Sequence, residues 1–291
     1  MLSILIPTYN YPVFSLVENL HNQLNKVAIE FEIVVLDDKS TDFVEENRKI
    51  INFGYCYFEQ NFDNLGRTKT RQNLAERAKF DWLLFLDADV VPEKNDFIQK
   101  YLACFNNNQV VFGGYKYENI PPVASKSLRY YYGKNREEKS AVLRNKKPYE
   151  FVFSGNMLIK KELFSMLNRN NLQNIYGMDV FFSHRLWENK IPISHINNAI
   201  FHLGIEENEV FFNKVLESIS FRKKMLADKI GIEKTNKLIA KYLMLKKWHL
   251  RSIVTIGFLI TGSLLKKLIF ARKPSLFFFD IYRLGYICKI K

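Results

Sequence analysis

The sequence of 291 residues predicts an α/β fold with a largely parallel sheet. Three apolar, strand-like runs lie in its first third, at residues 2–6, 31–36 and 82–86. Helix-like segments separate these runs. Pro7 ends the first run, and an Asp follows each of the other two. Strands that alternate with helices at this pace are typical of βαβ units, which build parallel sheets.

The remaining elements follow in order along the chain. Residues 12–27 have apolar positions at helical spacing, and residues 39–42 read as a turn that caps the next helix. The sequence predicts helices over 12–27, 42–51, 68–79, 160–167 and 179–188, strands over 55–59, 110–117, 151–159 and 196–203, and mostly helix from about 208 onward. Residues 120–150 are polar, basic and Tyr-rich, and they predict a mobile excursion over the site.

Three polar clusters stand where predicted strands end. They are Thr8-Tyr9-Asn10, Asp37-Asp38 and Asp87-Ala88-Asp89. Ligands bind beyond the carboxyl ends of parallel strands, so the topology gathers these clusters at one edge. A turn that begins at Asp87 can aim both carboxylates of the Asp-x-Asp motif at one point. Mg²⁺ and Mn²⁺ prefer such oxygen ligands and are commonly shared with a substrate diphosphate.

Three stretches of the chain resemble family 2 glycosyltransferases. Residues 3–10 (SILIPTYN) are similar to that family's opening strand and loop, residues 32–42 (EIVVLDDKSTD) to its second strand and turn, and residues 64–89 to its Asn-x-Gly, helix and Asp-x-Asp stretch. The resemblance covers roughly residues 1–204. It implies a GT-A fold, with a Rossmann-like nucleotide-binding half and a mixed central sheet, over residues 1–205. A basic, apolar helical region follows over 206–291.

The same resemblance implies an inverting enzyme of the hexosyltransferase type, which uses a nucleotide sugar, usually a UDP-sugar, with Mn²⁺ or Mg²⁺. It assigns roles to donor-side residues. Asp89 is the main metal ligand, Asp87 contacts ribose or metal, and Lys39 stands where the family prefers Gly. The donor-binding residues that it implies are Pro7, Thr8, Tyr9, Asp37, Asp38, Asn64, Gly66, Arg67, Asp87 and Ala88.

Two later residues fit the same scheme. Asp179, in Tyr176-Gly177-Met178-Asp179, occupies the place of the family's Glu-Asp motif and is the candidate general base. Met178 departs from the family's Glu, which puts its acceptor contact in doubt. His202 resembles the family's late metal-binding His and is the candidate third ligand beside Asp87 and Asp89.

Positive charge gathers at the C-terminal end of the chain. The net charge is +13, and the stretch from Lys214 onward holds 18 Lys/Arg but four Asp/Glu. Residues 252–265 are uncharged, too short to span a bilayer comfortably, and without a clean apolar stripe in projection. Aromatic and aliphatic residues interleaved with Lys/Arg indicate contact with an anionic membrane surface. The alternative is a packed helical subdomain with a solvated basic face. The large aliphatic neighbours argue against nucleic acid.

Together these patterns predict a non-processive enzyme that adds sugar to a glycan or lipid-linked acceptor in surface polysaccharide synthesis. No Gln-x-x-Arg-Trp motif follows residue 200. No signal peptide precedes the first strand, and three scattered cysteines fit a reducing compartment, so we expect a cytoplasmic protein, peripheral at the inner face of the cell membrane. Two alternatives stay open: a catalytically inactive, membrane-anchored scaffold, and a nucleotidyltransferase, which would usually need a Gly-rich loop at residues 7–12.

Overall fold

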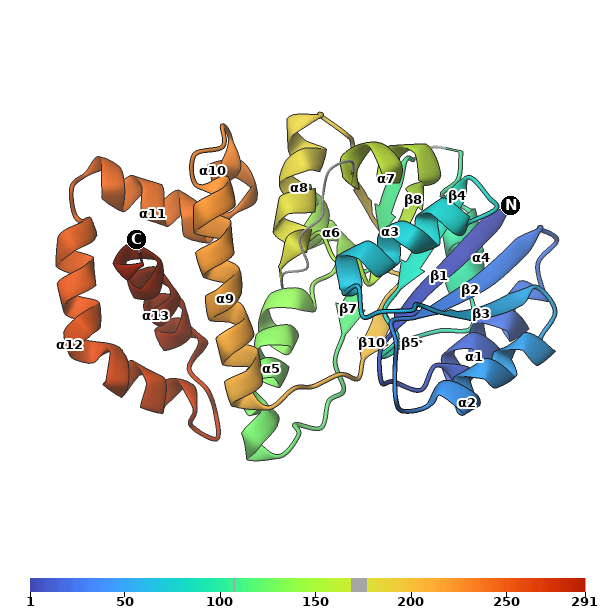
Figure 1. The fold of residues 1–291 in the computed structure, drawn as a ribbon. Helices are drawn as coiled ribbons and strands as arrows, with labels where there is room; N and C mark the ends of the chain where they lie inside the picture. Colours follow the sequence, from blue (N-terminus) through green and yellow to red (C-terminus); the bar gives the residue numbers. More distant parts are fainter. Residues whose placement is uncertain (107, 169–176, 291) are drawn as a thin grey trace. The chain divides into compact units, whose positions relative to one another are not determined.

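The structure is a computed structural model that describes residues 1–106, 108–168 and 177–290 (Figure 1). The chain packs as two compact units. The first comprises Met1–Lys116, Lys139–Asn174 and Lys190–Gly204, and the second comprises Tyr117–Glu138, Ile175–Asn189 and Ile205–Lys291. Two segments that the sequence grouped with the N-terminal domain, 117–138 and 175–189, thus cluster with the C-terminal helices.

A seven-stranded mixed sheet forms the centre of the first unit. Strands β3, β2, β1 and β4 are parallel, whereas β8 runs antiparallel to its neighbours β4 and β6. The parallel half confirms the βαβ prediction. In sheet order the strands are β3 (Cys56–Gln60), β2 (Phe31–Asp37), β1 (Leu2–Thr8), β4 (Trp82–Leu86), β8 (Asn156–Lys160), β6 (Val110–Phe112) and β9 (Ser194–His195).

Helices cover this sheet because each has one apolar side to bury. In α1 (Phe14–Leu24) the buried residues Leu16, Val17 and Leu20 recur at helical spacing, and the helix contacts β2. Helix α3 (Arg67–Arg77) packs on β1 and β2 through Leu74 and Ala75 (Figure 1). The other helices of this unit are α2 (Val44–Arg48), η1 (Lys49–Asn52), α4 (Phe97–Leu102), α6 (Ala141–Asn145), η4 (Pro148–Glu150) and α7 (Lys161–Asn168).

A second, three-stranded sheet has the order β5 (Val90–Pro92), β10 (Ile200–His202), β7 (Tyr115–Lys116). The prediction of one strand over residues 110–117 was wrong, because the chain divides at Gly113 and Gly114 between the two sheets. Gly114 has a φ of 93°, a left-handed conformation that side chains rarely adopt. The predicted strand over 196–203 is likewise confined to Ile200–His202.

Residues 120–150 form short helices instead of the predicted mobile excursion. In the first unit, Arg144 of α6 is 1% exposed, and its guanidinium donates to the carbonyl oxygens of Phe112, Gly113 and Ile196. Backbone carbonyls thus satisfy a charged side chain, so a basic composition did not imply exposure here. The helices of the second unit in this stretch are η2 (Ala124–Lys126), α5 (Ser127–Tyr132) and the π-helical turn η3 (Gly133–Glu137).

A buried histidine completes the surroundings of Arg144. His195 Nδ1 accepts from Arg144 Nη1 at 2.9 Å, and His195 Nε2 lies 2.9 Å from the Pro148 carbonyl oxygen, to which it donates. Burial lowers the pKa of His195 to about 4, and Arg144 adds to this effect. The ring is therefore neutral in the folded protein at neutral pH.

Every secondary-structure element in the described part of the second unit is a helix, as the sequence predicted for its C-terminal region (Figure 1). Its core gathers large aromatic and aliphatic residues, among them Phe211, Ile219 and Phe279. Two helices begin at side-chain caps: the Asn236 side chain accepts from Ile239 N, and the Ser275 hydroxyl accepts from Phe278 N. Besides α5, the helices are α8 (Met178–Glu188), α9 (Asn208–Leu226), α10 (Ile232–Thr235), α11 (Lys237–Lys247), α12 (Arg251–Ile269) and α13 (Leu276–Lys289).

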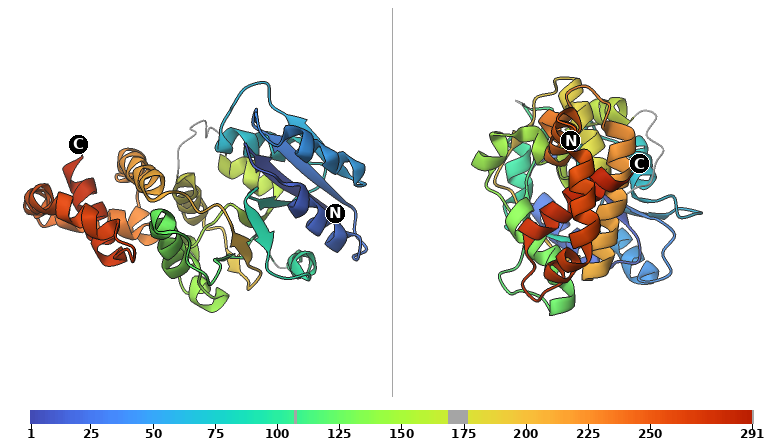
Figure 2. Two further views of the ribbon diagram at one scale, coloured as in Figure 1. Left: turned by 90° about the horizontal axis from the view of Figure 1, so that it is seen from below. Right: turned by 90° about the vertical axis from the view of Figure 1, so that its left-hand side faces the viewer.

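Helix α12 differs from the other helices in its composition. It has 19 residues, a mean hydropathy of 1.6 over its most apolar window, and only 17% of that window buried. Within residues 1–106, 108–168 and 177–290, it alone is long and apolar enough to cross a membrane. Helices α12 and α13 pack side by side, as Figure 1 and Figure 2 show.

Candidate active site

The carboxyl ends of three neighbouring strands meet at one edge of the main sheet. Thr8 pairs with Asp37 in the register of β1 and β2, and Asp87 directly follows β4 on the other side of β1. The polar clusters that the sequence placed at strand ends therefore come together, as predicted. Asp37 is fully buried: its Oδ1 accepts from Ser40 N at 2.7 Å and from Gln60 Nε2 at 3.0 Å. Its Oδ2 has no hydrogen-bond partner among the described residues.

Asp38 organises the loop that leads into α3. Its Oδ1 accepts from Asn61 Nδ2 and Leu65 N, each at 2.9 Å, and its Oδ2 accepts from Gly66 N at 2.7 Å. Asp38 is 5% exposed, and both of its carboxylate oxygens are hydrogen-bonded to this loop. Asp38 thus fixes where α3 begins, and it positions Arg67, the first residue of that helix.

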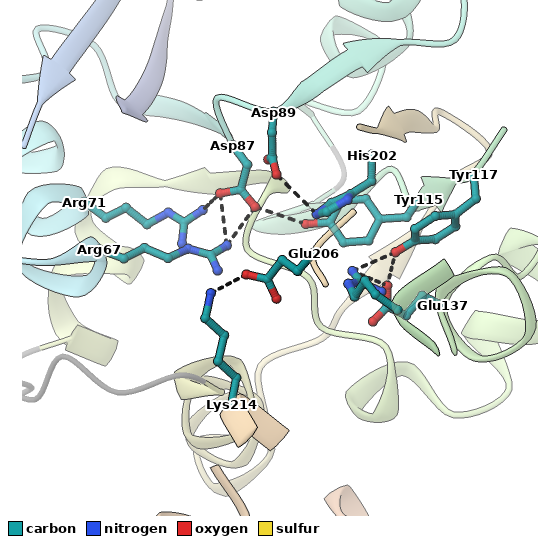
Figure 3. A network of polar contacts seen from close by, with 11 residues as sticks. Arg67, Arg71, Asp87, Asp89, Tyr115, Tyr117, Glu137, His202, Glu206 and Lys214 are labelled. Atoms are coloured by element: carbon teal, nitrogen blue, oxygen red, sulfur yellow. Dashed lines mark hydrogen bonds and ion pairs between the residues drawn. The ribbon is translucent and has the colours of Figure 1, made fainter. Parts of the chain in front are cut away.

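Two arginines of α3 converge on Asp87 (Figure 3). Arg67 Nη2 donates to both carboxylate oxygens of Asp87, at 2.7 and 3.0 Å, and Arg71 Nη2 donates to Oδ1. Arg71 also donates to Ser154 Oγ at 2.9 Å. Burial by itself would raise the pKa of Asp87, but the two guanidiniums lower it to about 2. Asp87 is therefore a permanent anion that holds two cations in place.

Asp89 faces His202 across the smaller sheet. Antiparallel pairing of β10 with β5 sets His202 opposite Val90, the residue after Asp89, and Leu203 N donates to the Asp89 carbonyl at 2.8 Å. His202 Nε2 lies 3.6 Å from Asp89 Oδ2. Figure 3 shows the two side chains pointing toward one another. The structure therefore brings together two of the three predicted metal ligands, while the oxygens of the third, Asp87, bind Arg67 and Arg71.

Two glycines leave room for the two carboxylates. A Cβ atom at Gly155 would lie 2.0 Å from Asp87 Oδ2, and one at Gly204 would lie 1.8 Å from Asp89 Oδ2. Both distances are far below van der Waals contact, so the absence of a side chain at these positions is what admits the carboxylates. Neither glycine has a positive φ, so both are explained by close approach.

The other predicted residues occupy varied positions. Pro7 and Ala88 are partly exposed, and Tyr9 and Asn64 are exposed. Asp179 lies in the first turn of α8, in the second unit, so its role as general base stays a prediction. Tyr176, of the same motif, lies outside the described residues.

Sequence reasoning missed two residues that contact the site. Arg71 follows Arg67 by one helical turn, a spacing that places both on one face of α3 and could have revealed it. Tyr115 has its hydroxyl 3.5 Å from Asp87 Oδ2, and its ring centroid lies 5.6 Å from that of His202. Tyr115 reaches this position because β7 joins β10, a pairing that no local pattern indicates.

A mixed sheet with a βαβ half, and an Asp-x-Asp turn beside a small sheet that carries a histidine, define the class of glycosyltransferases with the GT-A fold. The model of the family described as "Glycosyl transferase family 2" matches residues 3–167. The chain therefore belongs to glycosyltransferase family 2.

Relatives in sequence are themselves glycosyltransferases. The chain is 31% identical over 127 residues to an uncharacterized glycosyltransferase of Haemophilus influenzae, a match that covers 41% of this chain and 40% of that protein. It is 34% identical over 105 residues to the poly(ribitol-phosphate) beta-N-acetylglucosaminyltransferase TarS of Staphylococcus aureus, covering 34% of this chain and 17% of TarS. The chain thus spans less than half the length of these relatives.

Solved structures support the same fold. Residues 1–349 of S. aureus TarS, in complex with UDP-GlcNAc, superpose with a TM-score of 0.51 and 17% identity, covering 98% of this chain and 90% of that one. The mannosyltransferase PcManGT from Pyrobaculum calidifontis, in complex with GDP-Man and Mn²⁺, gives a TM-score of 0.60 at 12% identity and covers 98% and 85%. At these identities the likeness extends to the fold alone.

Proposed function

We propose that this glycosyltransferase is an inverting, metal-dependent, non-processive enzyme that transfers a sugar from a UDP-sugar to a glycan or lipid-linked acceptor in surface polysaccharide synthesis. The observation that carries the proposal is the presence, in the first unit, of both a buried carboxylate with an open acceptor atom and a carboxylate–imidazole pair. Asp37 supplies the first, and Asp89 with His202 the second.

The Asp37 carboxylate suits recognition of the nucleoside. A buried oxygen without a hydrogen-bond partner is costly, and a donor group of a bound base or ribose would satisfy it. Asp38 holds the neighbouring loop through backbone N–H groups, so the pocket wall is rigid before the donor binds. Tyr9, exposed beside this edge, would cover the nucleoside.

The Asp89–His202 pair fits a divalent cation in its chemistry. A carboxylate and an imidazole are both ligands of Mn²⁺, and such sites commonly combine one or two protein groups with substrate phosphate oxygens and water. Over the described residues, no group of three or more His, Cys, Asp or Glu side chains is arranged so that it could bind a metal ion by itself. The donor diphosphate would therefore complete the coordination. When bound, the cation neutralises charge on the leaving diphosphate.

The arginines of α3 have a separate role. Arg67 is about half exposed, at the N-terminal end of the helix, where the helix dipole also favours anions. Asp87 orients its guanidinium, and a bound diphosphate would be attracted by the same positive charge. Arg71, which is 8% exposed, holds Asp87 in place through an ion pair and donates a hydrogen bond to Ser154.

Inversion requires a base that takes the proton of the acceptor hydroxyl during attack on the anomeric carbon. Asp179 is our candidate, since its place in the first turn of α8 stabilises a negative charge. The absence of a Gln-x-x-Arg-Trp motif supports a non-processive reaction. The name of TarS gives poly(ribitol-phosphate) as the acceptor of that relative, and a polymeric acceptor there is compatible with the acceptor class proposed here.

The test uses purified protein with UDP-, GDP- and dTDP-sugars, with and without Mn²⁺. We expect metal-dependent hydrolysis of a UDP-sugar, and loss of this hydrolysis in Asp89→Ala. The matched control is Asp81→Ala, because Asp81 is exposed at the amino end of the same strand β4 that leads to Asp89. Equal, metal-independent behaviour of wild type and Asp89→Ala would refute the proposal.

The base is tested separately by Asp179→Asn. With an acceptor present we expect transfer to fall by about 10²–10⁴-fold, while donor binding stays within a factor of two or so of wild type. A variant that still transfers sugar at the normal rate would remove Asp179 from the mechanism and leave the donor site untouched.

A further inference from the structure

Helix α12 has two apolar faces, and only one of them is covered. Phe258, Leu265 and Ile269 are buried in the interior of the second unit. On the opposite side Ile253, Ile256, Ile260 and Leu264 are 59–76% exposed. Their spacing of three, four and four residues sets them on one line along the helix, about 16 Å long at 1.5 Å per residue. We call these four residues the apolar stripe.

Exposed aliphatic residues of this size rarely gather on a surface that meets only water. Scattered single exposed residues are normal, but a continuous row of four large aliphatics is a contact surface. Trp248 just before α12, 60% exposed, and Phe277 at the start of α13, 67% exposed, are exposed aromatic groups that precede and follow the stripe along the chain. Aromatic residues of this kind are favoured at the boundary between lipid and water.

A shallow groove accompanies the stripe. It lies between α12 and α13, has a volume of about 240 Å³, and is lined by residues such as Val254, Gly257 and Ile281. A Cβ atom at Gly257 would meet nothing within 4 Å, so the helix surface is open there. Apolar walls beside an apolar row suit an insertion of hydrocarbon chains more than contact with a folded polar surface.

Positive charge stands at both ends of the stripe. Lys246 and Lys247 close α11 on one side, and Lys267, Arg272 and Lys273 follow on the other, all of them exposed. Over residues 237–291 the sequence has twelve Lys/Arg and one acidic residue, Asp280. Among the described residues from 237 to 290, the one carboxylate side chain is that of Asp280, which already binds Arg136 and Arg283.

From this arrangement we propose that α12 lies in the plane of an anionic phospholipid surface, with the apolar stripe in the acyl boundary and the flanking Lys and Arg on headgroup phosphates. A helix with lipid-facing aliphatics and a cationic border is the physical requirement for such binding. The proposal concerns the second unit alone and does not rest on the proposed function.

The contacts of α12 favour lying in the surface over crossing it. Its covered face is held by α13 and by Arg251, whose Nε donates to the Cys288 carbonyl at 2.8 Å. A spanning helix would have to leave these partners, or carry the charged Asp280–Arg283 pair of α13 into hydrocarbon. Charge also argues against a second copy of this chain as the occupant, because two equally cationic surfaces would repel.

The experiment is sedimentation of the full chain with phosphatidylcholine vesicles, with and without phosphatidylglycerol. We expect binding that needs phosphatidylglycerol and weakens in high salt. The double variant Ile260→Asp/Leu264→Asp should lower the affinity by more than about tenfold, since each change removes a lipid-facing aliphatic group. Lys267→Glu should lower it about fivefold or more.

The matched control is Ile230→Asp, because Ile230 is 90% exposed in the same unit but outside the stripe. It should bind vesicles like wild type. Failure of wild type to bind phosphatidylglycerol vesicles, or equal binding by the double variant, overturns the proposal. So does dimerisation of wild type that the double variant abolishes without any change in vesicle binding. Binding that resists both high salt and alkaline extraction indicates a spanning helix and rules out the in-plane arrangement.

Discussion

A methyl group at position 204 should move the Asp89 carboxylate while leaving the fold intact. In Gly204→Ala the new Cβ atom would lie 1.8 Å from Asp89 Oδ2, whereas ordinary contact begins at 3.4 Å. The oxygen must therefore move by about 1.6 Å, the difference between these two distances. The displaced atom is the end of a short side chain, 26% exposed, so it can turn toward solvent without disturbing the core.

The stability and the activity should consequently respond differently. We expect the free energy of unfolding to change by less than about 1 kcal/mol, as is usual for substitutions outside the core. The rate should fall by roughly 10²-fold, the cost typical of a misplacement of about 1 Å in a positioned catalytic group. Half-saturation by Mn²⁺ should require a higher concentration, because Asp89 is the predicted ligand.

The assay is donor hydrolysis at varied Mn²⁺, together with urea unfolding of the same preparations. Gly54→Ala is the matched control, since a Cβ atom there would meet nothing within 4 Å and its φ is not positive. It should retain activity and metal response. Activity of Gly204→Ala within about twofold of wild type, with the same Mn²⁺ dependence, would refute the idea that the position of the Asp89 carboxylate governs the reaction.

Three further predictions concern stability and are checked by urea unfolding. Arg71→Met should lower the free energy of unfolding by about 2–3 kcal/mol, because it removes a buried partner of Asp87. Because Arg67 is half exposed, Arg67→Met should lower it by less than about 1 kcal/mol. Equal losses in the two variants would contradict this account. The pKa of His195 is lowered to about 4, so neutral His195 contributes its full stabilisation above pH ~6.5. As the pH falls from there toward 4, the free energy of unfolding should drop by up to about 3 kcal/mol. A His195→Gln variant with the wild-type pH profile of stability would exclude the effect. Lys39 has a φ of 67°, so Lys39→Gly should raise the free energy of unfolding by about 0.5–1 kcal/mol, whereas Lys39→Ala should leave it unchanged. A stabilising Lys39→Ala variant would rule out backbone strain as the cause of the difference.

The edge of the main sheet was predictable because it follows from local pattern and topology. Apolar runs that end at Thr8, Asp37 and Asp87 predict strands, the helices between them predict parallel pairing, and parallel strands share one carboxyl edge. The family resemblance added His202 and Asp89 as a pair. The long-range pairing of β10 with β5 confirms their proximity, and the spacing along the chain could not have predicted it.

The roles of individual carboxylates were less predictable, because they depend on which groups surround each one. Asp87 and Asp89 look equivalent in the sequence, yet Asp87 binds two arginines and Asp89 faces a histidine. Lys39 shows the same limit from another side. The family resemblance indicates a preference for Gly at this position, and the structure has Lys39 there in a left-handed conformation, with an ion pair to Asp63.

By itself, the sequence determined the class of fold, the family, and the concentration of positive charge in the C-terminal region, since periodicity, motifs and composition are written along the chain. The tertiary structure decided which surfaces are covered. The structure shows that α12 is apolar on two sides, whereas the helical projection showed no clean apolar stripe. Only the burial of Phe258 and Leu265 in the interior of the second unit distinguishes its covered side from its exposed side. Burial depends on partners distant in sequence, and local pattern does not contain them.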